Sequence, residues 1–598
     1  MVEDRTIASG QQSKGRGKKE KEQISHISNL IHAAESWRDS NYKDLWLDCY
    51  RRWRSRPKER RDGSNIFVPY SFMIQNVISS RCAESLFATR PAVSVLARND
   101  DASDNAEKVQ TLLDWVMAER MQLPRLFSEQ IISSMCIYGT VVTHTAWKKE
   151  VKRVQSSYSY EQPVLDEFGM PAIDENTGAP IVERIRAVET TDKVVYDDPY
   201  TQFIDLLDFF VDPKASGLDD ARYCGHKEYR TKAELERFKK DAGWKIDMKK
   251  LKSESSVDTG QQQRYQEHGN GDSDESHGGE EAGGLYKVYH FWEDNRHYVL
   301  VGDDQLAVSE DNPYYHGGLP YDMCRYLTLP QEFYGVGLME MLAGLQDELN
   351  TFRNQRIDYN SMALRRMWKL RKGCGLTARD MVWRQNGVLQ VENMDDVMEI
   401  PVQQLPASAF ANEASIKQDM KDATGCHDIL MGVANQDETA TTTMTKDNNA
   451  SIRFKEIVRA LADDLVVPIA QKCVSLEQQF MTVEKSIRLG SDTDMGGVLV
   501  VVNPFETEGE YDLIYVGTAV DPMANKTQAR QNLIQAIQIA QSIPAYQQSP
   551  DAVLEMMRKL LLACDFKDVD KMLPSLQPMI PPQMAHAPDS GMPPEGMM

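Results

Sequence analysis

The stretch that most constrains the fold runs from Phe333 to Asn360 and reads FYGVGLMEMLAGLQDELNTFRNQRIDYN. Its apolar residues recur at helical spacing and give one buried stripe, formed by Leu338, Met341, Leu342, Leu345, Leu349 and Phe352. The pattern predicts an amphipathic helix, and the pair Gly335 and Gly337 predicts a tight turn into it. The polar face is rich in amides and arginines, so we expect it to meet another polar surface, such as a neighbouring subunit.

Length and charge narrow the class of protein. A chain of 598 residues exceeds what one hydrophobic core usually supports, so we expect about two to four structural regions. The formal net charge of -22 argues against a protein that coats nucleic acid, because phosphate binding needs clustered Lys and Arg. Any contact with DNA should therefore be local or weak.

Cysteine usage and apolar runs indicate the compartment. The nine cysteines are dispersed and never form C-x-x-C, which predicts reduced thiols and no zinc framework. The N-terminus is polar and basic, with no secretory signal, and runs such as GVLVVV are too short to span a bilayer. We expect a soluble cytoplasmic product.

The N-terminal half reads as helices first and strands afterwards, which predicts an α+β fold. Residues 1–22 look like a disordered basic arm, and 23–338 form the α+β region. Within it, 156–187 predict a β-hairpin excursion, and 253–284 predict a disordered, solvated acidic insertion. His144 is expected on the polar face of a strand.

The C-terminal half alternates helical and β-containing segments. We expect, in order, a helix at 339–372 stopped by glycines, short strands in 373–405, a helix at 406–431, a polar loop at 432–449, a long helix at 450–483, strands in 484–523, helices in 524–564 and an unstructured tail at 565–598. Pro468 should kink the long helix, because it removes a backbone hydrogen bond.

No pattern of catalysis is found. There is no phosphate-binding Gly-x4-Gly-Lys loop, no H-E-x-x-H and no G-x-S-x-G, and the glycine pair lacks the third glycine of a dinucleotide fingerprint. Asp463 and Asp464 could bind a metal in a nuclease, but on an amphipathic helix they are more simply polar-face residues. We expect no catalytic residue, cofactor or metal.

Several phrases occur together in one order: YRRWR, NIFVPYSFMIQNVIS, CIYGTVVTHTAW, NPYYHGGLPY, GVGLMEMLAGLQDELNTFRNQRID, DATGCHDILMG with NQDETATT, and YDLIYVGTAV before NKTQARQ. Over residues 25–545 this text resembles the portal proteins of tailed bacteriophages, of the podovirus type. The ETAT loop and the LQDELNTFRNQRID helix are the most specific parts.

The resemblance implies a ring, usually of about twelve subunits, at one capsid vertex, with DNA entering and leaving through its channel. It implies a wing (23–338 and 484–523), an outgoing stem helix (339–372), a clip (373–405), a returning stem helix (406–431), a tunnel loop (432–449), a kinked tunnel helix (450–483) and a short C-terminal crown (524–564). The implied partners are double-stranded DNA, terminase, capsid protein and tail adaptors, without a membrane. The implied location is the virion, after assembly in the host cytoplasm.

The resemblance also assigns candidate residues. The tunnel loop would present Asn435, Gln436, Thr439, Thr441, Thr442, Thr443 and Lys446 to DNA. The stem would pack on neighbouring subunits through Gln346, Asp347, Asn350, Arg353, Asn354, Gln355, Arg356 and Asp358. The clip would bind the motor or an adaptor through Arg371, Lys372, Arg379, Trp383 and Arg384.

Two other classes of protein stay open on the sequence. One is a nuclease or another enzyme of the packaging apparatus that uses Asp463 and Asp464. The other is an adaptor or scaffold protein that binds the portal ring. A carboxylate cluster within a catalytic motif would favour the first, and a monomeric state would favour the second.

Overall fold

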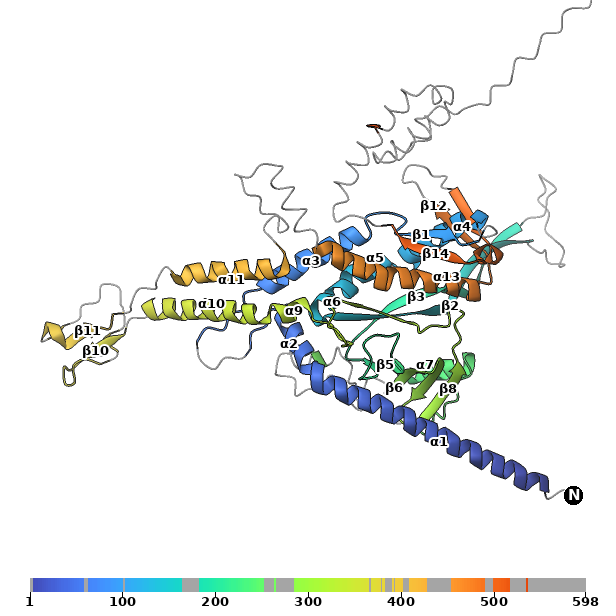
Figure 1. Cartoon of the computed structure of the whole chain (residues 1–598), viewed down its shortest axis with the longest axis horizontal. Coiled ribbons are helices and arrows are strands. Elements are labelled where there is room, and N and C mark those ends of the chain that lie inside the picture. Colours follow the sequence, from blue (N-terminus) through green and yellow to red (C-terminus); the bar gives the residue numbers. More distant parts are fainter. Residues whose placement is uncertain are drawn as a thin grey trace, which may run out of the picture. The chain divides into compact units, whose positions relative to one another are not determined.

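The computed structural model describes residues 4–58, 63–99, 103–163, 182–251, 263–264, 284–364, 367–377, 379–381, 390–391, 393–401, 408–426, 453–489, 498–516 and 534–535. The chain divides into two compact units, one of residues 1–487 with 500–520 and one of residues 488–499 with 521–598. Everything argued below concerns the first unit. It contains both helices and antiparallel sheets, so the α+β prediction is confirmed (Figure 1).

The helices have the following bounds: α1 Asp4–Arg38, α2 Asp44–Trp53, α3 Tyr70–Leu86, α4 Ser103–Trp115, α5 Leu123–Leu126, α6 Ile132–Tyr138, α7 Lys232–Asp241, α9 Leu338–Met341, α10 Ala343–Leu364, α11 Ser408–Thr424 and α13 Val467–Phe480. Residues 453–461 are also helical. In the described part of the chain, π-helical turns adjoin these helices at Asp39–Lys43, Val116–Arg120, Phe127–Ile131 and Ala462–Val466. Short 3-10 turns lie at Met394–Asp396 and Pro504–Thr507.

The strands have the following bounds: β1 Val93–Ala97, β2 Thr140–Pro163, β3 Val182–Ile204, β4 Phe209–Val211, β5 Tyr223–Thr231, β6 Leu285–Glu293, β7 Arg296–Val301, β8 Gln305–Asp311, β9 Tyr321–Arg325, β10 Trp368–Leu370, β11 Val397–Glu399, β12 Lys485–Leu489, β13 Val498–Val502 and β14 Tyr511–Tyr515. β4 to β8 form a five-stranded sheet in chain order, and β3-β2-β9 form a three-stranded sheet. β1 pairs with β14, so two segments more than 400 residues apart in the chain lie side by side.

The five-stranded sheet is covered on both faces. On one face α1 packs Ile27, Ile31 and Ala34 against a layer of aromatic rings that includes Phe210 and Phe291. Side chains alternate along a strand, so the neighbouring residues Val288 and Trp292 point to the opposite face. There α7 covers one end, and a cluster that includes β2 and β9 covers the other.

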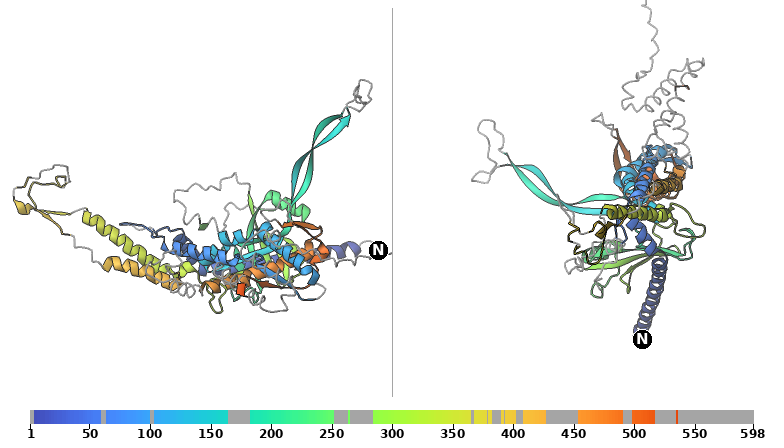
Figure 2. Two further views of the ribbon diagram at one scale, coloured as in Figure 1. Left: turned by 90° about the horizontal axis from the view of Figure 1, so that it is seen from above. Right: turned by 90° about the vertical axis from the view of Figure 1, so that its left-hand side faces the viewer.

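The predicted β-hairpin excursion is confirmed and is longer than expected. β2 and β3 pair from Val142 with Ile204 out to Pro163 with Val182, with one register shift at Glu150 and Val151. The two strands leave the body of the unit as a twisted ribbon (Figure 2). The base of β2 also pairs with β9, so the ribbon is anchored in the three-stranded sheet.

The glycine pair before α9 lies at a close crossing of two backbones. A Cβ atom on Gly139, which ends α6 with φ of +83°, would lie 2.1 Å from the carbonyl oxygen of Gly335. A Cβ on Gly337 would lie 2.7 Å from the carbonyl oxygen of Ile137. Side chains do not fit at these distances, so the pair brings α9 against the turn from α6 to β2.

Two predicted bounds differ from the structure. α1 begins at Asp4, within the segment predicted to be a disordered arm (1–22), because the lysines, glutamates and glutamines that suggested disorder are also good helix formers. The helix predicted at 339–372 ends at Leu364, and Trp368–Leu370 instead pairs with Val397–Glu399. Cross-strand pairing with a segment about thirty residues away overrides local helix propensity.

The acidic insertion lies almost entirely outside the described residues, and two of its residues are not solvated as predicted. Gln263 is 6% exposed, and Arg264 forms an ion pair with Asp205 at 2.6 Å. The Arg264 guanidinium also lies over the rings of Tyr50 and Tyr138, at 5.4 and 5.2 Å from the ring centres. The only arginine of the insertion therefore docks on the α+β core.

Candidate functional site

Helices α10 and α11 lie side by side, and we call them the helix pair (Figure 1). The two-stranded sheet β10–β11 lies between them along the chain, and in Figure 1 it is drawn beyond the end of α10. The N-terminal part of α10 and the C-terminal part of α11 are built into the main hydrophobic core, through Leu349 on α10 and through Ile416 and Met420 on α11. The helix pair thus projects from the core and carries the small sheet.

A ladder of hydrogen bonds fastens α10 to the extended segment that precedes α3 and to the first turn of α3. Its four side chains are spaced four residues apart: Gln346, Asn350, Asn354 and Asp358. They accept from the backbone N–H groups of Ser71 at 3.0 Å, Val68 at 2.9 Å, Ile66 at 2.8 Å and Ser64 at 2.6 Å, in that order. Four helical residues rise about 6 Å, close to two residues of extended chain, so Asn350, Asn354 and Asp358 meet every second N–H. The fourth donor, Ser71, comes three residues after Val68 and lies in the first turn of α3.

The amides of this ladder replace a strand partner. Asn354 accepts from the Ile66 N–H and donates to the Ile66 carbonyl at 3.0 Å, and Gln346 donates to the Val68 carbonyl at 2.7 Å. Gln346 is wholly buried and Asn354 is 6% exposed. Buried backbone groups must be paired, and this requirement explains why the helix face is rich in amides.

A buried carboxylate holds the two helices of the pair together. Glu413 on α11 accepts from Arg353, bonds to Arg356 at 2.7 Å and pairs with Lys417 at 3.2 Å. Burial alone would raise the pKa of Glu413, but the hydrogen bonds from Arg353 and Lys417 outweigh burial and lower the pKa below its ordinary value. The cluster therefore favours a charged Glu413 at neutral pH.

The far end of the helix pair exposes large apolar side chains. The exposed fractions are 58% for Met362, 84% for Leu364, 68% for Met367, 58% for Met398 and 54% for Phe410. These five residues, which we call the apolar patch, come from α10, β11, α11 and the link to β10. Large exposed apolar side chains of this kind favour contact with another protein surface.

A sequence profile of the phage SU10 portal protein family matches residues 23–592. The chain belongs to this family. It is a bacteriophage portal protein, which forms the ring at one capsid vertex through which DNA is packaged and ejected and to which the terminase and tail components bind. No curated protein matches the chain. The resemblance read from the sequence is thereby confirmed.

Portal proteins are structural components, and the match does not favour the nuclease or adaptor alternatives. Asp463 pairs with Arg459 at 3.3 Å, four residues away on the same helix. Burial, followed by the neighbouring Asp463, raises the pKa of Asp464. Neither belongs to the one group of three or more possible metal ligands found among the described residues.

The eight predicted subunit-interface residues of this portal protein mostly contact their own chain. Four form the ladder to residues 64–71, two bond to Glu413, and Asp347 pairs with Arg52 at 2.9 Å. Gln355 is exposed. The sequence therefore correctly predicted that this helix face meets polar groups, and the structure shows that most of those groups belong to the same chain.

The other candidate residues fall in two groups. The tunnel-loop residues lie outside the described part, as do Trp383 and Arg384. Arg371 donates its backbone N–H to the Asp396 carbonyl at 3.0 Å, and its side chain lies 3.7 Å from the Asp396 carboxylate. Lys372 and Arg379 are exposed.

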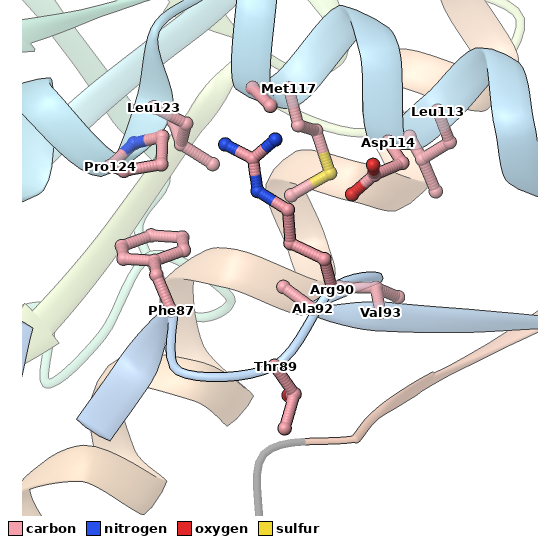
Figure 3. Close-up of a pocket in the computed structure, with 11 residues that line it drawn as sticks. Phe87, Thr89, Arg90, Ala92, Val93, Leu113, Asp114, Met117, Leu123 and Pro124 are labelled. Atoms are coloured by element: carbon pink, nitrogen blue, oxygen red, sulfur yellow. The ribbon is translucent and has the colours of Figure 1, made fainter. Parts of the chain in front are cut away.

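Two of the hollows lined by described residues differ in size and openness. The first, of about 100 Å³, lies between α4 and β1, and the Arg90 side chain reaches across it towards Met117 and Leu123 (Figure 3). Ligand pockets usually measure about 300 to 1,000 Å³, so this one suits a single side chain. The second is an open cleft of about 770 Å³ whose lining includes Arg325, Asp464 and Lys472.

Membrane insertion has no candidate among the described helices, none of which is both long and apolar enough to cross a bilayer. None of the eight described cysteines is in a disulfide, and all of them but Cys374 are buried.

Proposed function

We propose that the helix pair is the stem of a ring of about twelve subunits and that neighbouring stems pack through the apolar patch. The observation that carries this proposal is the exposure of Met362, Leu364, Met367, Met398 and Phe410 on a single chain. Burying five such side chains removes several hundred Å² of apolar surface from water, at about 25 cal/mol per Å². A ring supplies that burial at every subunit.

In a ring, the ladder of hydrogen bonds would set the position of each helix pair relative to its own core. In a closed ring, each helix pair keeps one fixed position relative to its own core, because every subunit repeats the same contacts. The four ladder side chains and Glu413 set that position inside each chain before subunits meet. Gln355, exposed on the same helix, is then available to a neighbouring subunit.

We assign residues 432–449 to a loop that faces DNA, with Asn435, Gln436, Thr439, Thr441, Thr442, Thr443 and Lys446 as its polar contacts. This part of the proposal rests on the sequence resemblance. DNA must slide through the channel, and each neutralised phosphate adds affinity that would slow it. A loop of threonines and amides in a chain with a net charge of -22 suits weak contact.

We assign the β10–β11 sheet and the adjoining residues to the clip, which would bind terminase during packaging and tail adaptors afterwards. Lys372 and Arg379 are exposed there, and the chain places Trp383 and Arg384 in the same connection. Exposed cations favour an acidic docking surface.

The mass of the purified particle tests the ring. Mass photometry of the wild-type protein should show a closed ring near twelve subunits. Leu364→Glu combined with Phe410→Glu should give monomers with unchanged circular dichroism, because two charges then enter the buried interface. Val483→Glu, at a residue that is 69% exposed outside the helix pair, is the control and should keep the ring. A wild-type monomer under all conditions would refute the proposal.

A further inference from the structure

Two histidines and a glutamate meet on one face of the five-stranded sheet. His226 and Glu228 are two residues apart on β5 and therefore point to the same side. His290 on β6 lies directly opposite His226 in the strand register. One ligand atom from each of the three residues lies within 4.8 Å of the others, and no other group of three or more His, Cys, Asp or Glu residues does so in the described part of the chain.

Both histidines are held by a hydrogen bond at their Nδ1 atom. His226 Nδ1 lies 2.6 Å from the Tyr321 hydroxyl, and His290 Nδ1 lies 3.3 Å from Nε2 of His297. His297 is held in turn by Glu310, with 3.2 Å between Nδ1 and Oε1. Metal-binding histidines have such partners on the nitrogen that does not bind the metal, because these fix the ring and its tautomer. The arrangement leaves the Nε2 atoms as the ligands.

The His226 ring is buried beside the ring of His290. His226 is 3% exposed, and its ring stacks on that of His290 with 4.9 Å between centres. Burial beside a second ring limits how far the His226 side chain can turn, so its place in the group is fixed by packing as well as by the bond to Tyr321.

A fourth histidine lies beside the group with an unused nitrogen. The His144 ring, from β2 of the other sheet, lies 5.2 Å from the ring of His226. Its Nδ1 is buried and has no hydrogen-bond partner. A buried polar atom without a partner costs about 1–3 kcal/mol, which a water bound at this place would recover.

Glu228 has other partners, and they leave it able to bind a metal. Oε1 accepts from Arg230 at 2.8 Å and lies 3.2 Å from His290 Nε2, and Oε2 accepts from Arg230 at 2.6 Å. Each carboxylate oxygen has two lone pairs, so one lone pair of Oε1 can bind an ion while Arg230 keeps its hydrogen bonds. The arginine then holds the carboxylate in place.

We propose that His226, Glu228 and His290 bind one zinc ion, with a water as the fourth ligand that donates a hydrogen bond to His144. Two imidazole nitrogens and one carboxylate oxygen are a donor set that zinc takes in proteins. Such an ion would cross-link β5 to β6 and, through the water, join the five-stranded sheet to β2. The ion would stabilise the fold of a single chain, so this proposal does not depend on how the subunits form a ring.

Cobalt substitution tests the site, since Co²⁺ in a four-coordinate nitrogen and oxygen site absorbs strongly in the visible range and the aqueous ion does not. The full chain, stripped with a chelator and dialysed, is titrated with Co²⁺ and then with Zn²⁺. We expect one Co²⁺ per chain with a visible band that an equimolar amount of Zn²⁺ abolishes. A wild-type chain without this band, or without zinc in elemental analysis after loading, would overturn the site.

Variants locate the ion. His290→Gln and Glu228→Gln should lose the band, and Tyr321→Phe, which keeps the ring but not the bond to His226, should weaken Co²⁺ binding about 10- to 100-fold. His26→Gln changes an exposed histidine and should leave binding unchanged. Equal binding by wild type, His290→Gln and Glu228→Gln would place the ion elsewhere and refute the proposal. Circular dichroism shows whether each variant is folded. If His290→Gln and Glu228→Gln do not fold, the Co²⁺ affinity of Tyr321→Phe tests the site instead.

Discussion

The Asp358 carboxylate accepts a hydrogen bond from the backbone N–H of Ser64, with 2.6 Å between Oδ1 and N, although 294 residues separate the two. The bond is the last rung of the ladder between α10 and the segment before α3. Gly63 precedes Ser64 with φ of +90°, and a Cβ atom there would lie 2.6 Å from Asp358 Oδ2. The turn and the carboxylate therefore fit each other only if residue 63 is glycine.

Removing the carboxylate should loosen the helix pair. Asp358→Ala leaves the Ser64 N–H without this acceptor, and a hydrogen bond to a charged group contributes about 1.5–3 kcal/mol. We expect a lower urea midpoint at fixed protein concentration. Asp358→Asn keeps an oxygen acceptor and should lose less, and Gln355→Ala, on the exposed face of the same helix, should change little. Equal urea midpoints for Asp358→Ala and Gln355→Ala would show that the hydrogen bond from Ser64 to Asp358 does not stabilise the chain.

The crossing of Gly139 and Gly335 should tolerate no side chain. Gly139→Ala would place Cβ 2.1 Å from the Gly335 carbonyl oxygen at φ of +83°, so the two backbones must separate. We expect a loss of more than about 4 kcal/mol or failure to fold. Gly344→Ala is the matched control, because no atom lies within 4 Å of its added Cβ and helical alanine is favoured over glycine by about 0.5–1 kcal/mol. Thermal unfolding of the two variants should shift in opposite directions.

The Glu413 cluster should make the helix pair sensitive to acid. The pKa of Glu413 is lower in the folded chain than its ordinary value, so its stabilisation is complete above the unfolded pKa of about 4.3 and is lost as pH falls through the folded pKa. Glu413→Gln leaves Arg353, Arg356 and Lys417 facing one another without the anion at every pH. The wild-type urea midpoint should therefore approach that of the variant below about pH 4. If the urea midpoints of wild type and Glu413→Gln differ as much in acid as at neutral pH, the charge of Glu413 is not the cause of the acid sensitivity.

The sequence predicted helix periodicity well and the partners of polar residues poorly. The stripe from Leu338 to Phe352 depends only on local spacing, and Leu338, Leu342 and Leu349 are buried as predicted. The prediction was wrong for Met341, which is 40% exposed, because α9 ends at this residue and α10 begins two residues later. The partner of Asn354 is Ile66, 288 residues earlier, and no local pattern shows such a pairing. The amides were correctly predicted to have polar partners, but those partners were expected on another subunit and lie in the same chain.

The histidine group was missed for a related reason. His144 was expected on a polar strand face, because alternation along β2 assigns a side and not what covers it. The signal available was His226-x-Glu228 on one strand with His290 and His297 on two later strands. Only the register of β5 with β6 shows that His226 and His290 are opposite.

Deletion of residues 433–445 should separate assembly from transport. The segment lies in the chain between α11 and the described helical residues 453–461. We expect rings of normal mass that package or retain less DNA, measured as nuclease-protected DNA per particle. Normal packaging by these rings would reject the assignment of the loop to the channel.

Charge reversal beside the β10–β11 sheet should weaken docking of the motor or adaptor. Lys372 is exposed, so Lys372→Glu should reduce binding in a pull-down without changing stability. Arg371→Glu would also repel Asp396, whose carboxylate lies 3.7 Å from the guanidinium, so a loss there has two causes. The exchange Arg371→Asp with Asp396→Arg restores the ion pair with its charges reversed. If binding depends on the charge at residue 371, this double variant folds normally but binds as weakly as Lys372→Glu; full binding would show that Arg371 serves only the fold of the sheet.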